Sequence, residues 1–355
     1  MSEKKIGTAL NRRSFLGRSA MLGAASVLAG GIFGPSAKAD ELPAADRGVA
    51  NRAPTSGDVA ILKFLAAAEL VEDDLWSQYA ELAINNKKYM KALKKIDPSL
   101  PSYTVQDRDN ERSHGLFINA YLTSIGQTAV NLDPFRTLPS VTATGAEQKG
   151  RLTNLTNLNV DTSWYARYRS AGNPDFGDTF PQIVNIVNRP TIPTSDSIKG
   201  GDLQAIAHTA LFHFATIEQG GASLYNSLMT KVSDLDVLNI LTSIGPVEFY
   251  QFAAFHKSTE RIFKLKSKDG SLTFPDLRKD PVAQDIFPEP CKFLRADLPL
   301  SSVLRPRNTA TAGAVATATA LVASNLFQGQ PPAFLDAVVA LATAADAAVR
   351  TLPVG

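Results

Sequence analysis

Four segments of the sequence combine a helical apolar period with a glutamate inside the apolar stripe. Apolar residues recur at a spacing of about 3.6 in each segment, which predicts an α-helix with one buried side. The glutamates stand three, four or seven residues from these apolar positions, so they share the buried side. They are Glu69, Glu111, Glu218 and Glu248. Because a buried carboxylate is costly unless it is paired or bound to metal, the pattern favours folds in which the helices meet around shared cations.

The predicted helices are ordered as two pairs separated by a long connection. They cover residues 58–93, 104–128, 202–230 and 234–264. The connection, residues 130–200, is rich in Asn, Thr, Pro and Gly and has no sustained period, so it predicts a crossover with short elements. Two helix pairs joined by one long crossover are the order of one class of four-helix bundle, so we expect an all-α fold.

Two local signals refine these helices. Thr104 followed by Asp107 resembles a capping box and predicts the start of the second helix. Gly245 and Pro246 lie inside the fourth helix. Because proline removes one intrahelical hydrogen bond, we expect a kink there.

A Glu-x-x-His spacing on the second helix points to metal chemistry. Glu111 and His114 are three residues apart, so they share a helix face and reach one centre together. Di-iron and di-manganese bundles combine one Glu from each of two helices with Glu-x-x-His from each of the other two. The pattern therefore predicts an iron or manganese site of one or two ions. Its expected ligands are Glu69, Glu111, His114, Glu218 and Glu248.

Four motifs together resemble one known family. They are Ala68-Glu69-Leu70-Val71-Glu72, Glu111-Arg112-Ser113-His114, the third-helix run from Glu218 to Tyr225 and the fourth-helix run from Ile244 to Gln251. The chain resembles the ferritin-like family of exported bacterial proteins, related to the plant desiccation-related proteins. The resemblance covers roughly 58–129 and 202–264. It implies a ferritin-like four-helix bundle with a carboxylate-bound metal centre.

The chain departs from the family's pattern on the fourth helix. Where the resemblance implies a second Glu-x-x-His, the sequence has Glu248-x-x-Gln251. Gln251 is therefore the sixth expected ligand, through an amide oxygen that binds iron or manganese more weakly than imidazole does. His256 stands about 12 Å further along the helix than Glu248, so it does not simply replace the missing histidine.

Each candidate ligand has an ordinary structural alternative. Glu111 and His114 can form a buried hydrogen bond or an exposed pair, and the other three glutamates can be satisfied by Arg, Tyr or water. Glu72 and Asp73 flank the first-helix face and are expected in solvent. His208 and His213 are expected in packing or at the surface. His256 is expected to form a helix-surface or half-buried pair with Glu260. The crossover run from Trp164 to Arg169 is expected to form a cap over the helices, with binding of a partner as the alternative.

The N-terminal segment has the features of a twin-arginine export signal. Arg12 and Arg13 precede Ser-Phe-Leu, a mildly apolar stretch covers 20–33, and Ala37-Lys38-Ala39 is a small-x-small site. We therefore expect residues 1–39 to be a signal peptide cleaved after Ala39, and the protein to be periplasmic or extracellular. The alternative is a general secretory signal that happens to carry two arginines. The expected partner in transport is the twin-arginine export machinery.

Charge and cysteine content exclude other classes. Residues 1–39 hold six basic residues and one acidic residue, so the remaining chain has 30 basic and 33 acidic residues, a formal net charge of −3. Such a chain lacks the concentrated basic face of a nucleic-acid-binding protein. Cys291 is the only cysteine, so the fold depends on its core rather than on an internal disulfide.

The remaining segments flank the expected bundle. Residues 40–57 predict a linker, and 265–308 an irregular, proline-rich connection. Residues 309–355 predict an Ala-rich helical tail split by Pro331-Pro332. This tail is weakly apolar for a bilayer span, so we expect no stable membrane anchor and close packing on the main domain or on a second copy of the chain. The latter would make the protein a homo-oligomer.

Two functions remain open at this stage. The first is a metal protein that uses redox cycling at bound iron or manganese on dioxygen, peroxide or ferrous iron. The second is a non-enzymatic scaffold with a degenerate metal site, acting in stress protection or partner binding. No nucleophile elbow, phosphate loop or dinucleotide fingerprint occurs in the sequence, and catalysis is left undecided.

Overall fold

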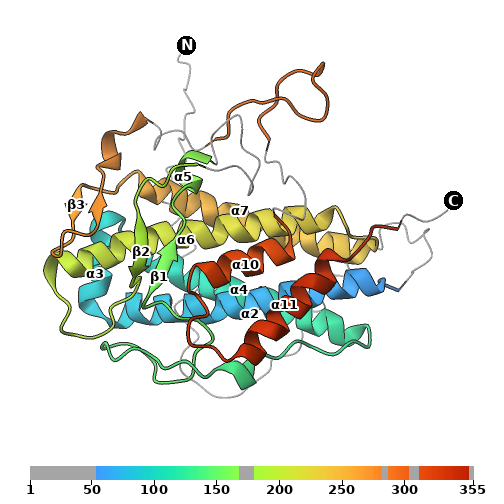
Figure 1. Ribbon diagram of the computed structural model, residues 1–355, viewed down its shortest axis with the longest axis horizontal. Helices are drawn as coiled ribbons and strands as arrows, with labels where there is room; N and C mark the ends of the chain where they lie inside the picture. Colours follow the sequence, from blue (N-terminus) through green and yellow to red (C-terminus); the bar gives the residue numbers. More distant parts are fainter. Residues whose placement is uncertain (1–52, 168–179, 282–286, 304–311, 352–355) are drawn as a thin grey trace, which may run out of the picture. The chain divides into compact units, whose positions relative to one another are not determined.

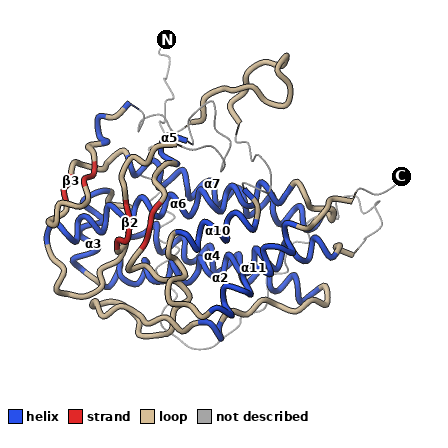
Figure 2. Tube along the Cα trace, viewed as in Figure 1, coloured by secondary structure: helices blue, strands red, loops and turns tan. Residues whose placement is uncertain are grey.

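The computed structural model describes residues 53–167, 180–281, 287–303 and 312–351. Within these ranges the chain is mostly helical, with two short two-stranded antiparallel sheets (Figure 2). The expected all-α class is thereby confirmed at the level of secondary structure. The signal peptide and most of the linker lie outside the described residues.

Four long helices form two closely packed pairs, α2 with α4 and α6 with α7 (Figure 1). These helices are α2 (Ser56–Asn85), α4 (Leu100–Ser124), α6 (Gly200–Met229) and α7 (Leu235–Thr259). Aromatic rings join the two pairs in the core: the ring centroid of Trp76 lies 5.0 Å from Phe214 and 5.4 Å from Phe255. All three side chains are fully buried, so the apolar stripes of the helices meet as their spacing predicts.

The first predicted helix, over 58–93, is interrupted. It breaks at Asn86, whose side chain accepts a hydrogen bond from the Tyr89 backbone N–H and caps α3 (Lys87–Ile96). Asn86 also donates to the Thr144 carbonyl at 2.9 Å, which fixes the turn against the crossover. The apolar period of the sequence runs on past Asn86, so it gave no sign that this residue ends one helix and caps the next.

The capping box predicted at Thr104 and Asp107 is wrong. α4 begins at Leu100 with Pro101 in its first turn, and Thr104 Oγ1 donates to the Pro101 carbonyl at 3.0 Å. Asp107 is a buried mid-helix residue. Pro101 is pre-organised for a first helical turn, which is why the helix starts before Thr104. The capping box that does form in the first helix pair joins Thr55 and Asp58 at the start of α2.

α7 runs through Pro246 as one assigned helix and ends at Thr259 instead of Lys264. The expected kink at Pro246 stays a prediction.

The crossover lies against α2 and α6. Its short elements are η1 (Asp133–Phe135), β1 (Leu158–Val160), α5 (Trp164–Arg167) and β2 (Ile186–Arg189). Buried Asp74 of α2 anchors it by accepting from the backbone N–H groups of Leu152, at 3.0 Å, and Thr153, at 2.9 Å. Trp164 is fully buried against Phe252, as expected of a cap over the helices.

The C-terminal part also packs against the long helices. Its described elements are β3 (Leu265–Lys266), β4 (Thr273–Phe274), η2 (Leu277–Lys279), α10 (Ala314–Ala323) and α11 (Pro332–Asp346). The Ala-rich tail forms the two predicted helices, α11 packing on α2 and α10 on α6 (Figure 1). Alanine side chains permit this close approach. In the described parts of the chain, no helix has the length and apolarity to cross a membrane.

Candidate metal centre

Each of the four long helices brings at least one acidic side chain to the same buried region. Glu111 and His114 point from one face of α4 because they are three residues apart. Glu69 of α2 and Glu248 of α7 face them, and all four residues are buried. The ligand atoms of these four lie within 4.8 Å of one another, close enough to hold one metal ion.

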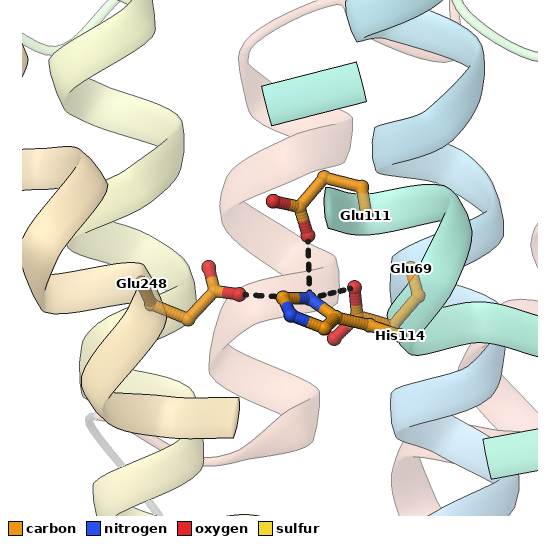
Figure 3. A group of neighbouring side chains, drawn as sticks. All are labelled: Glu69, Glu111, His114 and Glu248. Carbon is orange, nitrogen blue, oxygen red and sulfur yellow. Dashed lines mark hydrogen bonds and ion pairs between the residues drawn. The ribbon is translucent and has the colours of Figure 1, made fainter. Parts of the chain in front are cut away.

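His114 stands at the centre of this first group (Figure 3). Its Nδ1 lies 3.1 Å from Glu111 Oε2, 3.3 Å from Glu69 Oε2 and 3.8 Å from Glu248 Oε1. Three carboxylates from three helices therefore point at one imidazole nitrogen.

A second group overlaps the first. Glu72, Glu218 and Glu248 also place carboxylate oxygens within 4.8 Å of one another. Glu248 belongs to both groups, so its carboxylate can bridge two adjacent ions. The centre as a whole spans α2, α4, α6 and α7.

Several oxygens of the centre have no hydrogen-bond donor. Both oxygens of Glu218, Oε2 of Glu248 and Oε2 of Glu72 are shielded from solvent without such a partner. An unpaired buried carboxylate oxygen is strongly unfavourable, and a metal ion is the partner that carboxylate oxygens in this arrangement fit. The residues present therefore suit a bound cation.

The pKa values of the centre reflect the cost of burying several carboxylates together. Burial, together with the charge of Glu111, raises the pKa of Glu69 to about 8. Burial likewise raises the pKa of Glu72, Glu218 and Glu248 well above the usual value. Burial lowers the pKa of His114, but its contacts with Glu111 and Glu69 outweigh burial and raise that pKa to about 10. Without metal, the centre accordingly retains protons that a divalent cation would displace.

Three neighbours hold the ligands in place. Tyr225 of α6 donates its hydroxyl hydrogen bond to Glu69 Oε1. Gln251 of α7 donates to Glu111 Oε1 at 2.6 Å. Gly221 leaves room for Glu248, because a Cβ at this position would overlap Glu248 Oε2. These contacts orient the oxygens as outer-shell partners do in metal proteins.

The structure brings together the five residues expected as primary ligands and gives the sixth another contact. Glu69, Glu111, His114 and Glu248 form the first group, and Glu218 joins Glu248 in the second. The amide of Gln251 points its nitrogen at Glu111, so the structure shows it as a hydrogen-bond donor.

Two acidic residues near the centre escaped the sequence analysis. Glu72 was expected in solvent, but it belongs to the second group. Its position three residues after Glu69 on the same face was the available signal. Asp107 was assigned to a cap, yet it is buried one turn before Glu111, and burial and the Glu111 charge raise its pKa.

The other histidines lie elsewhere. His208 and His213 are buried in packing, and His213 Nδ1 lies 2.7 Å from the Tyr79 hydroxyl. His256 was expected to form a surface or half-buried pair with Glu260, but it is fully buried and packs against Trp164 and Phe252. Among the described residues it joins neither group.

The donor set fits a hard or borderline divalent cation. Carboxylate oxygens suit manganese and one imidazole also suits iron, while the described part of the chain places no thiolate at the centre. Comparison with protein-family models, with curated proteins and with solved structures finds no significant match. The chemistry of the centre is therefore argued from its geometry.

Proposed function

We propose that this protein is an exported, ferritin-like metalloprotein that binds one or two iron or manganese ions between α2, α4, α6 and α7. In this proposal the four long helices form a ferritin-like four-helix bundle, and the chain belongs with the exported relatives of the desiccation-related proteins. The support is the order of the helices along the chain and the four motifs they carry.

One observation carries the metal proposal. Glu69, Glu111, Glu218 and Glu248 are each at most 2% exposed, and they meet at one place in the core. In their ionised forms four carboxylates this close repel one another, and the single imidazole of His114 supplies at most one positive charge. Divalent cations remove this repulsion and supply partners for the unpaired oxygens.

The residues of the chain have separate parts in metal uptake. His114 would give up a proton to bind as a neutral imidazole, so uptake would release protons. Glu248 would contribute a carboxylate oxygen to each group, since both groups share it. Bound iron or manganese would supply redox chemistry toward dioxygen, peroxide or ferrous iron. Tyr225 and Gln251 would hold Glu69 and Glu111 at fixed orientation.

Metal analysis of the purified protein tests this function. We expect about one or two ions of iron or manganese per chain, and a strong loss in Glu111→Gln and in His114→Ala. Glu260→Gln is the matched control, because Glu260 follows the same α7 that carries Glu248 but contacts Lys257 instead of the centre. Well under one ion per chain after reconstitution with either metal would contradict the proposal.

Export is the second part of the proposal. We propose that residues 1–39 direct the protein through the twin-arginine machinery to the periplasm or the cell exterior, as its Arg12-Arg13 motif indicates. A route that carries folded proteins suits a centre built from four helices. Replacing both arginines by lysine should leave the chain in the cytoplasm, as cell fractionation would show.

A non-enzymatic scaffold is the alternative, and the contact between Gln251 and Glu111 favours it. An amide donor stands where a second imidazole is expected, and it satisfies one ligand oxygen without metal. Under this alternative, Glu111→Ala would leave the cellular phenotype intact while removal of residues 309–355 would abolish it. The opposite result would exclude the scaffold function.

A further inference from the structure

An apolar cavity lies beside the metal centre. It has a volume of about 430 Å³, is partly open to solvent, and is lined by α2, α6, the β1–β2 segment, α10 and Val338 of α11. This volume is within the range of pockets that hold small organic molecules. The C-terminal helices, which add nothing to the metal centre, thus form one wall of this space.

Most of the lining is aliphatic or aromatic. Val71 and Leu75 face it from α2, Ile217 from α6 and Leu321 from α10. The acidic side chains of the lining are Glu72 and Asp161. Among the described residues, the lining contains no Lys or Arg that would pair with an anionic ligand, and the apolar walls disfavour a strongly hydrated cation.

The cavity reaches the metal centre through Glu72. This residue lines the cavity and also belongs to the second carboxylate group. Gly221 of α6, where an added Cβ would overlap Glu248, also lines the cavity. Across the cavity, Thr317 Oγ1 of α10 is shielded from solvent and has no hydrogen-bond partner. A ligand with one neutral polar group would satisfy that hydroxyl.

We propose that this cavity binds a neutral, predominantly apolar small molecule, with one end beside Glu72 and the metal centre. The inference deepens the proposed function, because it assigns the class of molecule that reaches the bound ions. The walls supply the binding free energy through burial of apolar surface. Thr317 supplies a polar contact that distinguishes alcohols and ketones from hydrocarbons.

Fluorine NMR with 4-fluorobiphenyl as probe tests the cavity on metal-free protein. We expect saturable binding that Ala320→Trp weakens about tenfold or more. Ala320 lines the cavity from an exposed position on α10, so the indole can enter the space without disrupting the core. Ala340→Trp is the matched control, because Ala340 is exposed on α11 and does not line the cavity. Absent binding, or equal binding by both variants, would overturn the proposal.

Manganese loading tests the position of the ligand. Paramagnetic Mn²⁺ at the centre should broaden the signal of the bound probe strongly, whereas diamagnetic Zn²⁺ should not. Broadening no greater than with Zn²⁺, with both metal and probe bound, would overturn the placement beside Glu72. If the chain binds neither Mn²⁺ nor iron, the proposed function fails by itself. The Ala320→Trp comparison then still decides whether the cavity binds ligand, and the shift of the bound probe in Glu72→Gln decides its placement.

Discussion

Gln251 of α7 donates a hydrogen bond to Glu111 of α4, with Nε2 and Oε1 2.6 Å apart in the buried interior. This contact joins the two helix pairs at the metal centre. It also occupies the position at which the sequence motif leads one to expect a histidine. Replacing this donor by a ligand tests how far the centre is from full metal binding.

Gln251→His should increase the metal content or affinity of the centre. Imidazole is a better ligand for iron and manganese than a carboxamide, and the position already faces Glu111. We expect about tenfold tighter Mn²⁺ binding in calorimetric titration. Gln251→Leu is the control: it leaves Glu111 Oε1 without its donor, and should cost about 1–3 kcal/mol in metal-free stability. Equal metal affinity in the His and Leu variants would contradict a ligand position at residue 251.

Glu248→Gln should have opposite effects on the two forms of the protein. Burial holds the pKa of Glu248 well above its usual value, so its ionised form destabilises the metal-free fold. The neutral amide should raise metal-free stability at pH 7.5 by about 1–3 kcal/mol. Metal binding should fall, because the carboxylate that both groups share is lost. Urea denaturation without Mn²⁺ measures the metal-free stability, and the added stability with Mn²⁺ measures metal binding. A variant less stable in both forms would show that Glu248 is structural.

Gly221→Ala should weaken metal binding through a steric effect. The added methyl group would overlap Glu248 Oε2 and push that carboxylate out of both groups. We expect at least about a tenfold loss of Mn²⁺ affinity. Gly201→Ala is the matched control in the same helix, because a Cβ there meets no atom within 4 Å. Unchanged affinity in Gly221→Ala would show that Glu248 is not constrained against α6.

His213 should make the protein less stable in mild acid. Burial lowers its pKa from the usual 6.5 to about 3, so the unfolded chain binds a proton below pH 6.5 that the folded chain does not. The free energy of unfolding is therefore unaffected by the titration of this residue above pH 6.5 and falls as the pH decreases from 6.5 toward 3. Between pH 7 and pH 5 the loss is about 2 kcal/mol.

The comparison that isolates this effect is His213→Gln, measured by denaturation at both pH values. Gln retains a polar group near the Tyr79 hydroxyl but does not titrate. The stability difference between wild type and variant should therefore shrink on going to pH 5. An equal difference at both pH values would mean that His213 does not remain neutral in the fold.

Asp346 should stabilise the C-terminal helices by capping α10. Its Oδ1 accepts from the Ala314 N–H at 3.0 Å, and its Oδ2 from the Val315 N–H at 2.9 Å. Asp346→Ala should cost about 1 kcal/mol and increase hydrogen exchange in α10. Asp336→Ala, exposed on the same α11, is the control and should change little. Similar exchange in the two variants would argue against the cap.

The sequence by itself determined the helical character of the chain and the face on which each helix carries its acid. Period and polarity are local properties, so Glu69, Glu111, Glu218 and Glu248 could be placed on buried faces before any fold was known. The two helices of the Ala-rich tail and their break near Pro331 followed from the same local rules. The resemblance added the expectation of a common centre.

Tertiary structure decided which polar groups actually meet. The position of Glu72 on α2 does not by itself show which side chains it meets. The approach of α6 and α7 gives it Glu218 and Glu248 as neighbours. Gln251 became a hydrogen-bond donor because Glu111 faces it from another helix, 140 residues away. The cavity under α10 depends on segments from α2, the crossover and the tail. Contacts of this kind depend on how helices pack, and periodicity within one helix carries no information about its partner.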